Sequence, residues 1–247
     1  MTQTILIIGA TSSMAEAFAL RYAKESAQFF LVARNKDKLD VVSANLTAHG
    51  ASRVISFVMD GNDSHLLPEL LNTIWKTYER IDLALIAYGT LPNQCRAQTD
   101  IPYAIAEFRT NAESVIACMA GLAERFALQQ MGVIAVIGSV AGDRGRASNY
   151  LYGSAKAAIE TYASGLRGRL SRAGVHVLTI KPGFVATEMT AQLNLPALLT
   201  VSPEHVARDI HHAILKRKDV LYTPWFWAII MRIIRAVPEV IFKRMRF

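Results

Sequence analysis

The chain has 247 residues, 52% of them hydrophobic and 19% charged, which suits a single globular α/β domain. Its net charge of +7 is concentrated late in the chain, because residues 216–247 hold eight basic residues against two acidic ones. A nucleic-acid binder more often spreads positive charge over its whole body, so we expect no nucleic-acid partner. Cys95 and Cys118 match no metal or disulfide spacing, and MTQTILIIGA lacks the basic start of a signal peptide. We therefore expect no metal site, free thiols and a cytoplasmic protein.

Apolar runs typical of buried strands alternate with segments of helical pattern. The strand-like runs are 4–9, 29–33, 54–58, 83–87, 133–138, 176–180 and 220–222, and the helix-like segments are 14–25, 36–48, 64–78, 101–129, 150–172 and 203–216. This alternation indicates a parallel sheet with helices on both faces, and right-handed crossovers make it a doubly wound, Rossmann-type α/β fold. The sequence predicts one such domain over residues 1–224 and an amphipathic helical tail over residues 225–247.

The stretch GATSSMA, residues 9–15, forms the first turn from a strand into a helix. Such a turn lies at the carboxyl edge of the sheet, where the N-terminus of the helix favours an anion. Gly9 permits close approach of the backbone to a phosphate, and the hydroxyls of Thr11, Ser12 and Ser13 add hydrogen-bond donors. An ordinary structural turn with a serine cap is the alternative.

The stretch VIGSVAGDRGRASNYLYGSAKAAIETY carries the residues with the clearest chemistry. Ser139 follows a strand, and Tyr152 and Lys156 are one helical turn apart, so they share a face of a helix. A phenol near a fixed ammonium is expected to have a lowered pKa, which suits proton transfer in carbonyl and alcohol chemistry. The Ser139 hydroxyl is placed to donate a hydrogen bond to a developing oxyanion.

With this constellation the sequence resembles the classical short-chain dehydrogenases/reductases over nearly all of the chain to about residue 220. The resemblance implies a catalytic tetrad of Asn111, Ser139, Tyr152 and Lys156, in which Asn111 holds a water in a proton relay from Lys156. It implies that the first turn binds a pyrophosphate, with Ser13 in place of a glycine. The expected cofactor contacts are Gly9, Thr11, Ser12, Ser13, Met14, Arg34, Asp60, Gly89, Tyr152, Lys156, Pro182, Gly183, Val185 and Thr187.

Two motifs depart from the family pattern. The family's T-G-x-x-x-G-x-G is here IGATSSMA, and its N-N-A-G at the fourth strand is here IAYGT, which retains only Gly89. Both changes fall in the cofactor cleft and leave every catalytic residue in place. The sequence therefore predicts an active enzyme.

A closer resemblance joins SVAGDRGRASNYLYGSAKA, YGTLPNQ and the tail to the subgroup that contains decaprenylphosphoryl-2-keto-erythro-pentose reductases. It implies a ketone on a lipid-linked sugar as the substrate. A soluble ketone such as a 3-oxoacyl thioester is the alternative substrate, and a non-catalytic nucleotide-binding membrane scaffold is the alternative outside enzymes. The charged loop of Asp143, Arg144 and Arg146 is either solvated or in contact with an anionic substrate phosphate.

The end of the second strand favours NADP(H), with NAD(H) as the alternative. An acid at that place hydrogen-bonds the ribose hydroxyls of NAD and repels a 2′-phosphate, but LVARNKDKL has Ala33 there. Arg34 follows and is suited to pair with the 2′-phosphate.

The tail WFWAIIMRIIRAVPEVIFKRMRF has the pattern of a basic amphipathic helix, interrupted and restarted at Pro238. Charges at 232, 235, 239, 243 and 246 form one stripe, and Ile230, Ile233, Val237 and Ile241 form an apolar stripe beside it. With Trp225, Phe226 and Trp227 at its start, the tail suits peripheral contact with a membrane. Packing on a sister subunit in a homodimer or homotetramer, or over the substrate pocket, is the alternative.

Overall fold

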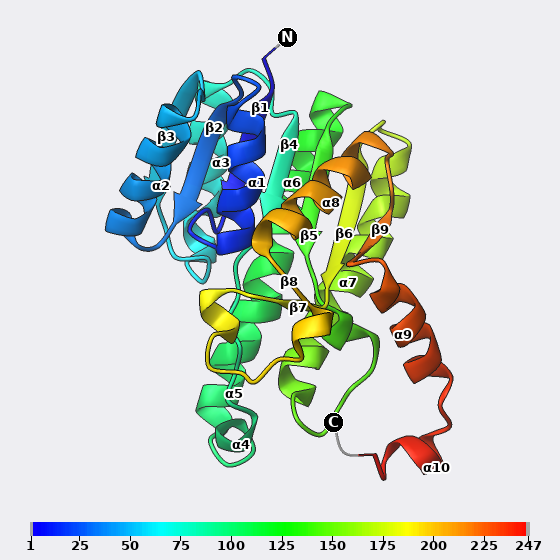
Figure 1. Ribbon diagram of the computed structural model, residues 1–247. Helices are drawn as coiled ribbons and strands as arrows, with labels where there is room; N and C mark the ends of the chain where they lie inside the picture. The colour runs from blue at the N-terminus through cyan, green and yellow to red at the C-terminus, as the bar shows by residue number, and fades with distance from the viewer. Residues whose placement is uncertain (1, 246–247) are drawn as a thin grey trace.

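Seven parallel strands form the central sheet of the protein, of which the computed structural model describes residues 2–245 (Figure 1). The strands lie in the order β3-β2-β1-β4-β5-β6-β9. They span β1 (Thr4–Ile8), β2 (Gln28–Ala33), β3 (Arg53–Val58), β4 (Leu83–Ile86), β5 (Val133–Ile137), β6 (His176–Pro182) and β9 (Val220–Thr223). Every predicted strand is confirmed, including the run at 220–222, which forms the edge strand β9 beside β6.

Helices cover both faces of this sheet because its strands are apolar on both sides. Neighbouring residues of β1 show this: Ile5 and Leu6 are both fully buried, yet they belong to opposite hydrophobic cores. One core contains α1 (Ser13–Ala23), α2 (Lys36–Ala48) and α8 (Pro203–Leu215); the other contains α3 (Leu67–Thr77), α6 (Ser114–Gln129) and α7 (Tyr150–Ser171). The predicted doubly wound Rossmann-type fold is confirmed.

The single helix predicted over residues 101–129 is wrong. The segment is α5 (Ile101–Phe108), a π-helical turn (Arg109–Glu113) and then α6. Asn111 lies in the π-helical turn and is fully buried, and its side-chain amide donates to the Glu107 carbonyl oxygen (3.0 Å). A π turn leaves the carbonyl four residues back without its usual α-helical partner, and the Asn111 side chain takes that place.

Strands β2 and β3 are added on one side of β1, and β4 and the later strands on the other. This change of side between β1 and β4 leaves a crevice at the carboxyl ends of the two strands. The first turn, which contains Gly9, lies in this crevice close to the backbone after β4. Gly9 has φ +90°, and a Cβ there would lie 2.7 Å from the Tyr88 Cβ. A short parallel pair, β7 (Phe184–Val185) and β8 (Thr200–Val201), lies at the same end of the sheet, as does α4 (Gln94–Ala97) (Figure 1).

The tail forms α9 (Phe226–Ala236) and α10 (Glu239–Phe242), with Pro238 between them as predicted. Two details of the predicted tail are wrong. Trp227 is buried rather than interfacial, because with Met231 and Val140 it forms a small third core. The predicted apolar stripe is divided, since Ile230 packs inward while Ile233 is exposed. The charge at position 246 lies outside the described residues.

Among residues 2–245, no helix has both the length and the apolar character needed to cross a membrane.

Candidate active site

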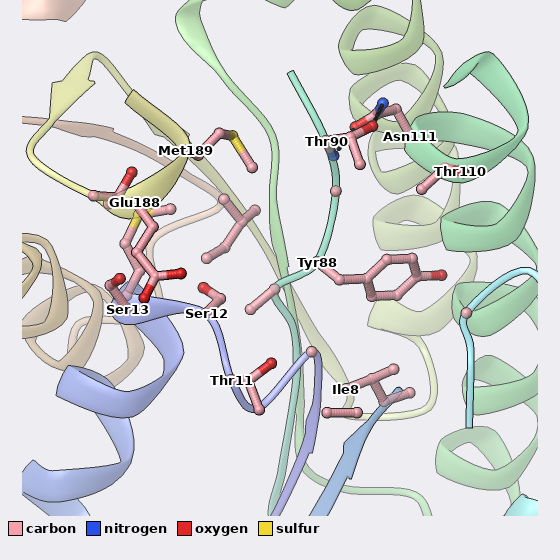
Figure 2. Close-up of a pocket in the computed structure, with 18 of the residues that line it drawn as sticks. Ile8, Thr11, Ser12, Ser13, Tyr88, Thr90, Thr110, Asn111, Glu188 and Met189 are labelled. Carbon is pink, nitrogen blue, oxygen red and sulfur yellow. Dashed lines mark hydrogen bonds between the residues drawn. The ribbon is translucent and has the colours of Figure 1, made fainter. Parts of the chain in front are cut away.

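One cavity of about 470 Å³ lies at the carboxyl end of the sheet, within the size range of ligand sites (Figure 2). Every residue predicted for catalysis or cofactor binding lines it. These are Gly9, Thr11, Ser12, Ser13, Met14, Arg34, Asp60, Gly89, Asn111, Ser139, Tyr152, Lys156, Pro182, Gly183, Val185 and Thr187. The lining also includes residues that sequence analysis missed, among them Asn35, Lys38, Thr90, Glu188 and Met189.

The first turn fits both interpretations offered for it. Ser12 is the N-cap of α1, and its hydroxyl accepts a hydrogen bond from the Ala15 N–H at 3.4 Å. The turn also lines the cavity, so the N-terminus of α1 is directed at a place where an anion is favoured. The serine cap is therefore confirmed, and phosphate binding by the same turn stays a prediction.

Tyr88, the departure from the family's N-N-A-G pattern, leaves the cavity open. Its ring extends toward α6, where its hydroxyl donates to Ser114 Oγ (3.0 Å), and burial raises its pKa. The ring lies against Gly61, where a Cβ would approach the ring carbons to 2.6 Å. Because Gly61 has no side chain, there is room for the large Tyr88 ring beside it.

Three of the four predicted catalytic residues, Ser139, Tyr152 and Lys156, come from the end of β5 and the start of α7. The Lys156 ammonium donates to the Ile137 carbonyl oxygen (3.0 Å) and lies 5.5 Å from the centre of the Tyr152 ring. The lowered pKa expected for the phenol is wrong: burial raises the pKa of Tyr152 to about 12, although the Ser139 hydroxyl opposes the shift. Burial also lowers the pKa of Lys156 to about 8. Tyr152 is therefore a protonated phenol at neutral pH.

Asn111 is fixed beside this pair by Thr90. The Asn111 Oδ1 accepts from the Thr90 N–H (2.9 Å), and its amide donates to Thr90 Oγ1 (2.8 Å), so the two side chains lie together in Figure 2. A Cβ on Gly89 would lie 2.7 Å from Asn111 Oδ1 and 3.6 Å from Lys156 Nζ. The missing side chain at position 89 is what lets Asn111 and Lys156 approach the same point.

A buried group of charges lies behind Ser139. Glu160 accepts a hydrogen bond from the Ser139 N–H (2.9 Å) and pairs with Lys181 (2.8 Å), which also pairs with Asp143. Tyr222 donates to the other oxygen of Asp143 (2.9 Å). Burial raises the pKa of Glu160, and Lys181 opposes the shift. The group holds the Ser139 backbone through Glu160 and the following loop through Asp143, and sequence analysis missed it because its members are far apart in the chain.

The cavity has a charged rim at the end of β2. Arg34 lies 3.8 Å from Asp60, and Lys38 pairs with Glu188 at 2.9 Å. Asn35 caps α2 by accepting from the Lys38 N–H (2.9 Å), so the N-terminus of α2 also reaches this rim. Two cations and a helix N-terminus therefore lie beside the predicted ribose end of the cleft.

Arg144, in the predicted charged loop after Ser139, is not a solvated residue but binds the tail. Contact of this loop with a substrate phosphate stays a prediction. The Arg144 guanidinium donates to the carbonyl oxygens of Ile234 and Val237, pairs with Glu239 (2.8 Å) and stacks 3.7 Å from the centre of the Phe242 ring. Arg144 thereby fixes the tail to the loop that carries the catalytic serine.

The tail also contacts the segment predicted to line the nicotinamide. A Cβ on Gly183 would lie 1.9 Å from the Trp227 Nε1, so the indole rests directly on the Gly183 backbone. The sequence left three places open for the tail: a membrane, a sister subunit and the substrate pocket. The inward side of α9 packs near the pocket of its own chain.

The fold and this cavity define a dinucleotide-binding oxidoreductase of Rossmann type. Residues 3–197 match the short chain dehydrogenase family, and the protein belongs to that family.

Known proteins agree with this assignment. An uncharacterised oxidoreductase of Mycobacterium tuberculosis strain H37Rv is 35% identical over 98% of this chain and 96% of its own. A short-chain dehydrogenase from Sphingobium yanoikuyae, solved with NADPH, has a similar fold, with a TM-score of 0.83 at 23% identity, covering 99% of this chain and 96% of its own. The bulky-bulky ketone specific alcohol dehydrogenase from Comamonas testosteroni is also similar, with a TM-score of 0.82 at 21% identity over 99% and 95%.

Proposed function

We propose that the protein reduces a ketone to a secondary alcohol with NADPH. The observation that carries the proposal is the position of Tyr152, Lys156, Ser139 and Asn111 in the same cavity as the phosphate-binding turn. The residues fit a dinucleotide, because the positive φ of Gly9 and the capped start of α1 form a turn that a phosphate can approach. A scaffold without catalysis would have no use for this tetrad.

The chain's own groups account for the proton and for the orientation of the substrate. When bound, the nicotinamide supplies the hydride that the carbonyl carbon receives. Tyr152 gives its proton to the carbonyl oxygen, Ser139 donates a hydrogen bond to the same oxygen, and Lys156 holds the ribose hydroxyls. The Asn111 amide, fixed by Thr90, orients water that returns a proton toward Lys156. Glu160 keeps Ser139 in place from behind.

The raised pKa of Tyr152 predicts which of the two reactions, ketone reduction or alcohol oxidation, has a rate that depends on pH. The overall reduction takes up one proton, so the ratio of oxidation to reduction kcat/KM must rise about tenfold per pH unit. With the phenol protonated at neutral pH, reduction stays constant from about pH 6 to about pH 8, and oxidation carries the whole change. Steady-state rates in both directions over this range test it. A reduction rate that falls with pH while oxidation stays constant would place the pKa of Tyr152 below 7.

The charged rim predicts a preference for NADPH over NADH. Arg34, Lys38 and the start of α2 are placed to receive the 2′-phosphate, and no acid occupies position 33. We expect Arg34→Ala to weaken NADPH binding about tenfold and NADH binding little, measured by fluorescence titration. Arg169→Ala, an arginine of similar exposure on α7, is the control and should change neither. Tighter binding of NADH by the unaltered protein would contradict the assignment.

For the substrate we propose a bulky ketone, and within that class the keto group of a lipid-linked sugar. The resemblance of SVAGDRGRASNYLYGSAKA and of the tail to the lipid-linked pentose reductases supports it. A similar fold occurs in an alcohol dehydrogenase described as specific for bulky-bulky ketones. The decisive experiment is a screen that offers lipid-linked ketosugars, soluble bulky ketones and 3-oxoacyl thioesters with NADPH. Turnover of the thioester alone would favour the soluble alternative. A homodimer or homotetramer in solution stays a prediction.

A further inference from the structure

Helix α9 is apolar on two opposite sides. The inward side contains Trp227 and Met231, which are 3% and 0% exposed, and it packs on Val140 and Phe184. On the other side Trp225, Ile229 and Ile233 repeat every four residues and are 71%, 51% and 63% exposed. The inward contacts explain why Trp227 and Met231 are apolar, but they do not explain the apolar residues on the other side of the helix. The outward side needs a different explanation.

The short helix α10 adds exposed apolar side chains to those of α9. Val240 and Ile241 are exposed there, while Phe242 is buried under the Arg144 guanidinium. We call the exposed set the outward tail face. It consists of Trp225, Ile229, Ile233, Val240 and Ile241, with the exposed basic residues Arg232, Arg235, Lys243 and Arg244 among them.

The charge of the outward tail face is of one sign. Among residues 225–245 the one acidic residue is Glu239, and it is paired with Arg144 at 2.8 Å. Arg232 is next to Ile233 in the chain and lies one turn from Ile229, so a positive charge borders the apolar stripe. Such a face suits a surface that offers both apolar contact and negative charge. In a two-fold contact with a second copy, the same basic residues would face each other and repel.

The outward tail face is held at the end of the molecule where the cavity lies (Figure 1). Arg144 binds three groups of the tail, and Trp227 rests on Gly183, so the tail has a fixed position relative to the active site. More exposed apolar side chains come from the segment between β7 and β8, namely Met189, Leu193 and Leu198. Of these, Met189 also lines the cavity.

We propose that the outward tail face binds the surface of an anionic lipid membrane and presents the active site to a ketone carried by a lipid in that membrane. The second half rests on the proposed reductase function; the first half does not. The basic residues attract anionic headgroups, while Trp225, Ile229 and Ile233 enter the boundary between headgroups and acyl chains.

The test is co-sedimentation of the full-length protein with vesicles of phosphatidylcholine, with and without phosphatidylserine. We expect binding that needs phosphatidylserine and weakens as salt is added. Ile229→Asp/Ile233→Asp should lower the partition coefficient about tenfold or more, and Arg232→Ser/Arg235→Ser about 10- to 30-fold. Val41→Asp/Leu128→Asp changes two equally exposed apolar residues on α2 and α6 and should bind like the unaltered protein. Point substitutions replace a truncation, because deleting the tail would also remove Trp227 and Met231 from the third core.

Two further measurements separate the outcomes. The rate at which a soluble ketone is reduced with NADPH should be the same in all these variants. If the unaltered protein reduced no soluble ketone, the reductase function would be in question, but the vesicle result would still stand. Light scattering reports the oligomeric state. An unaltered protein that ignores anionic vesicles at low salt would overturn the proposal. So would an Ile229→Asp/Ile233→Asp variant that dissociates from an oligomer, because it would assign the outward tail face to a second copy of the chain.

Discussion

Replacing Tyr152 by phenylalanine is expected to lower kcat for ketone reduction about 10²- to 10⁴-fold, because it removes the proton donor and keeps the ring. The half-buried ring retains its packing, so the dissociation constant for NADPH should stay nearly unchanged. Stopped-flow single turnovers, together with a fluorescence titration of the cofactor, separate these two quantities.

Tyr150 provides the matched control for this variant. It lies on the same helix two residues earlier, is 44% exposed, and does not line the cavity. Tyr150→Phe should therefore leave kcat within about twofold of the unaltered enzyme. If Tyr150→Phe were the inactive variant and Tyr152→Phe the active one, the assignment of the catalytic helix would be wrong.

Replacing Lys181 by methionine is expected to cost about 3–5 kcal/mol of the free energy of unfolding, the range for removing one partner from buried ion pairs. Lys181 forms ion pairs with both Asp143 and Glu160, whose side chains are 2% and 8% exposed. Burial alone would lower the pKa of Lys181, but Glu160 and Asp143 outweigh it and raise the pKa. Without Lys181 the two carboxylates repel each other in a poorly solvated place.

Urea unfolding at two pH values tests this prediction. Burial raises the pKa of Glu160 and Lys181 opposes that shift, so removing Lys181 raises the pKa of Glu160 further above its unfolded value. The loss of stability should therefore be smaller at about pH 5, where Glu160 is more fully protonated, than at about pH 7. Lys36→Met removes an exposed lysine from its pair with Asp40 and should leave the unfolding midpoint unchanged. A Lys181→Met protein as stable as the unaltered one at both pH values would show that the group contributes nothing to the fold. Turnover in the variant reports separately on the position of Ser139.

Local patterns were sufficient to predict the sheet, and the family resemblance supplied most of the predicted cavity lining. Each apolar strand is followed by an amphipathic helix, and the carboxyl ends of parallel strands meet at one edge. The predicted residues after β1, β2, β4, β5 and β6 could therefore be brought together without knowing any contact. Tyr152 and Lys156 were predictable because the four-residue spacing on a helix fixes their relation.

The parts that sequence analysis missed depend on contacts between distant residues. The π-helical turn at Asn111 is stabilised by Thr90, twenty-one residues earlier, and nothing in the segment 101–129 alone signals it. The pKa of Tyr152 was predicted in the wrong direction because spacing reveals the neighbouring Lys156 but not the burial, which is the larger effect. Arg144 was read as a loop residue, although its partners lie about ninety residues further along the chain.

The contact of Trp227 with Gly183 bears on how this protein can be recombined with its relatives. The tail follows β9, the last strand of the sheet, and has its own charge pattern, which makes it a natural segment to exchange in a chimera. Yet the indole occupies the space that any side chain at position 183 would need. A chimera that brings Trp227 onto a catalytic domain with alanine or serine at position 183 should misfold locally, and changing that residue to glycine should rescue it. Trp227 and Gly183 therefore have to be exchanged together.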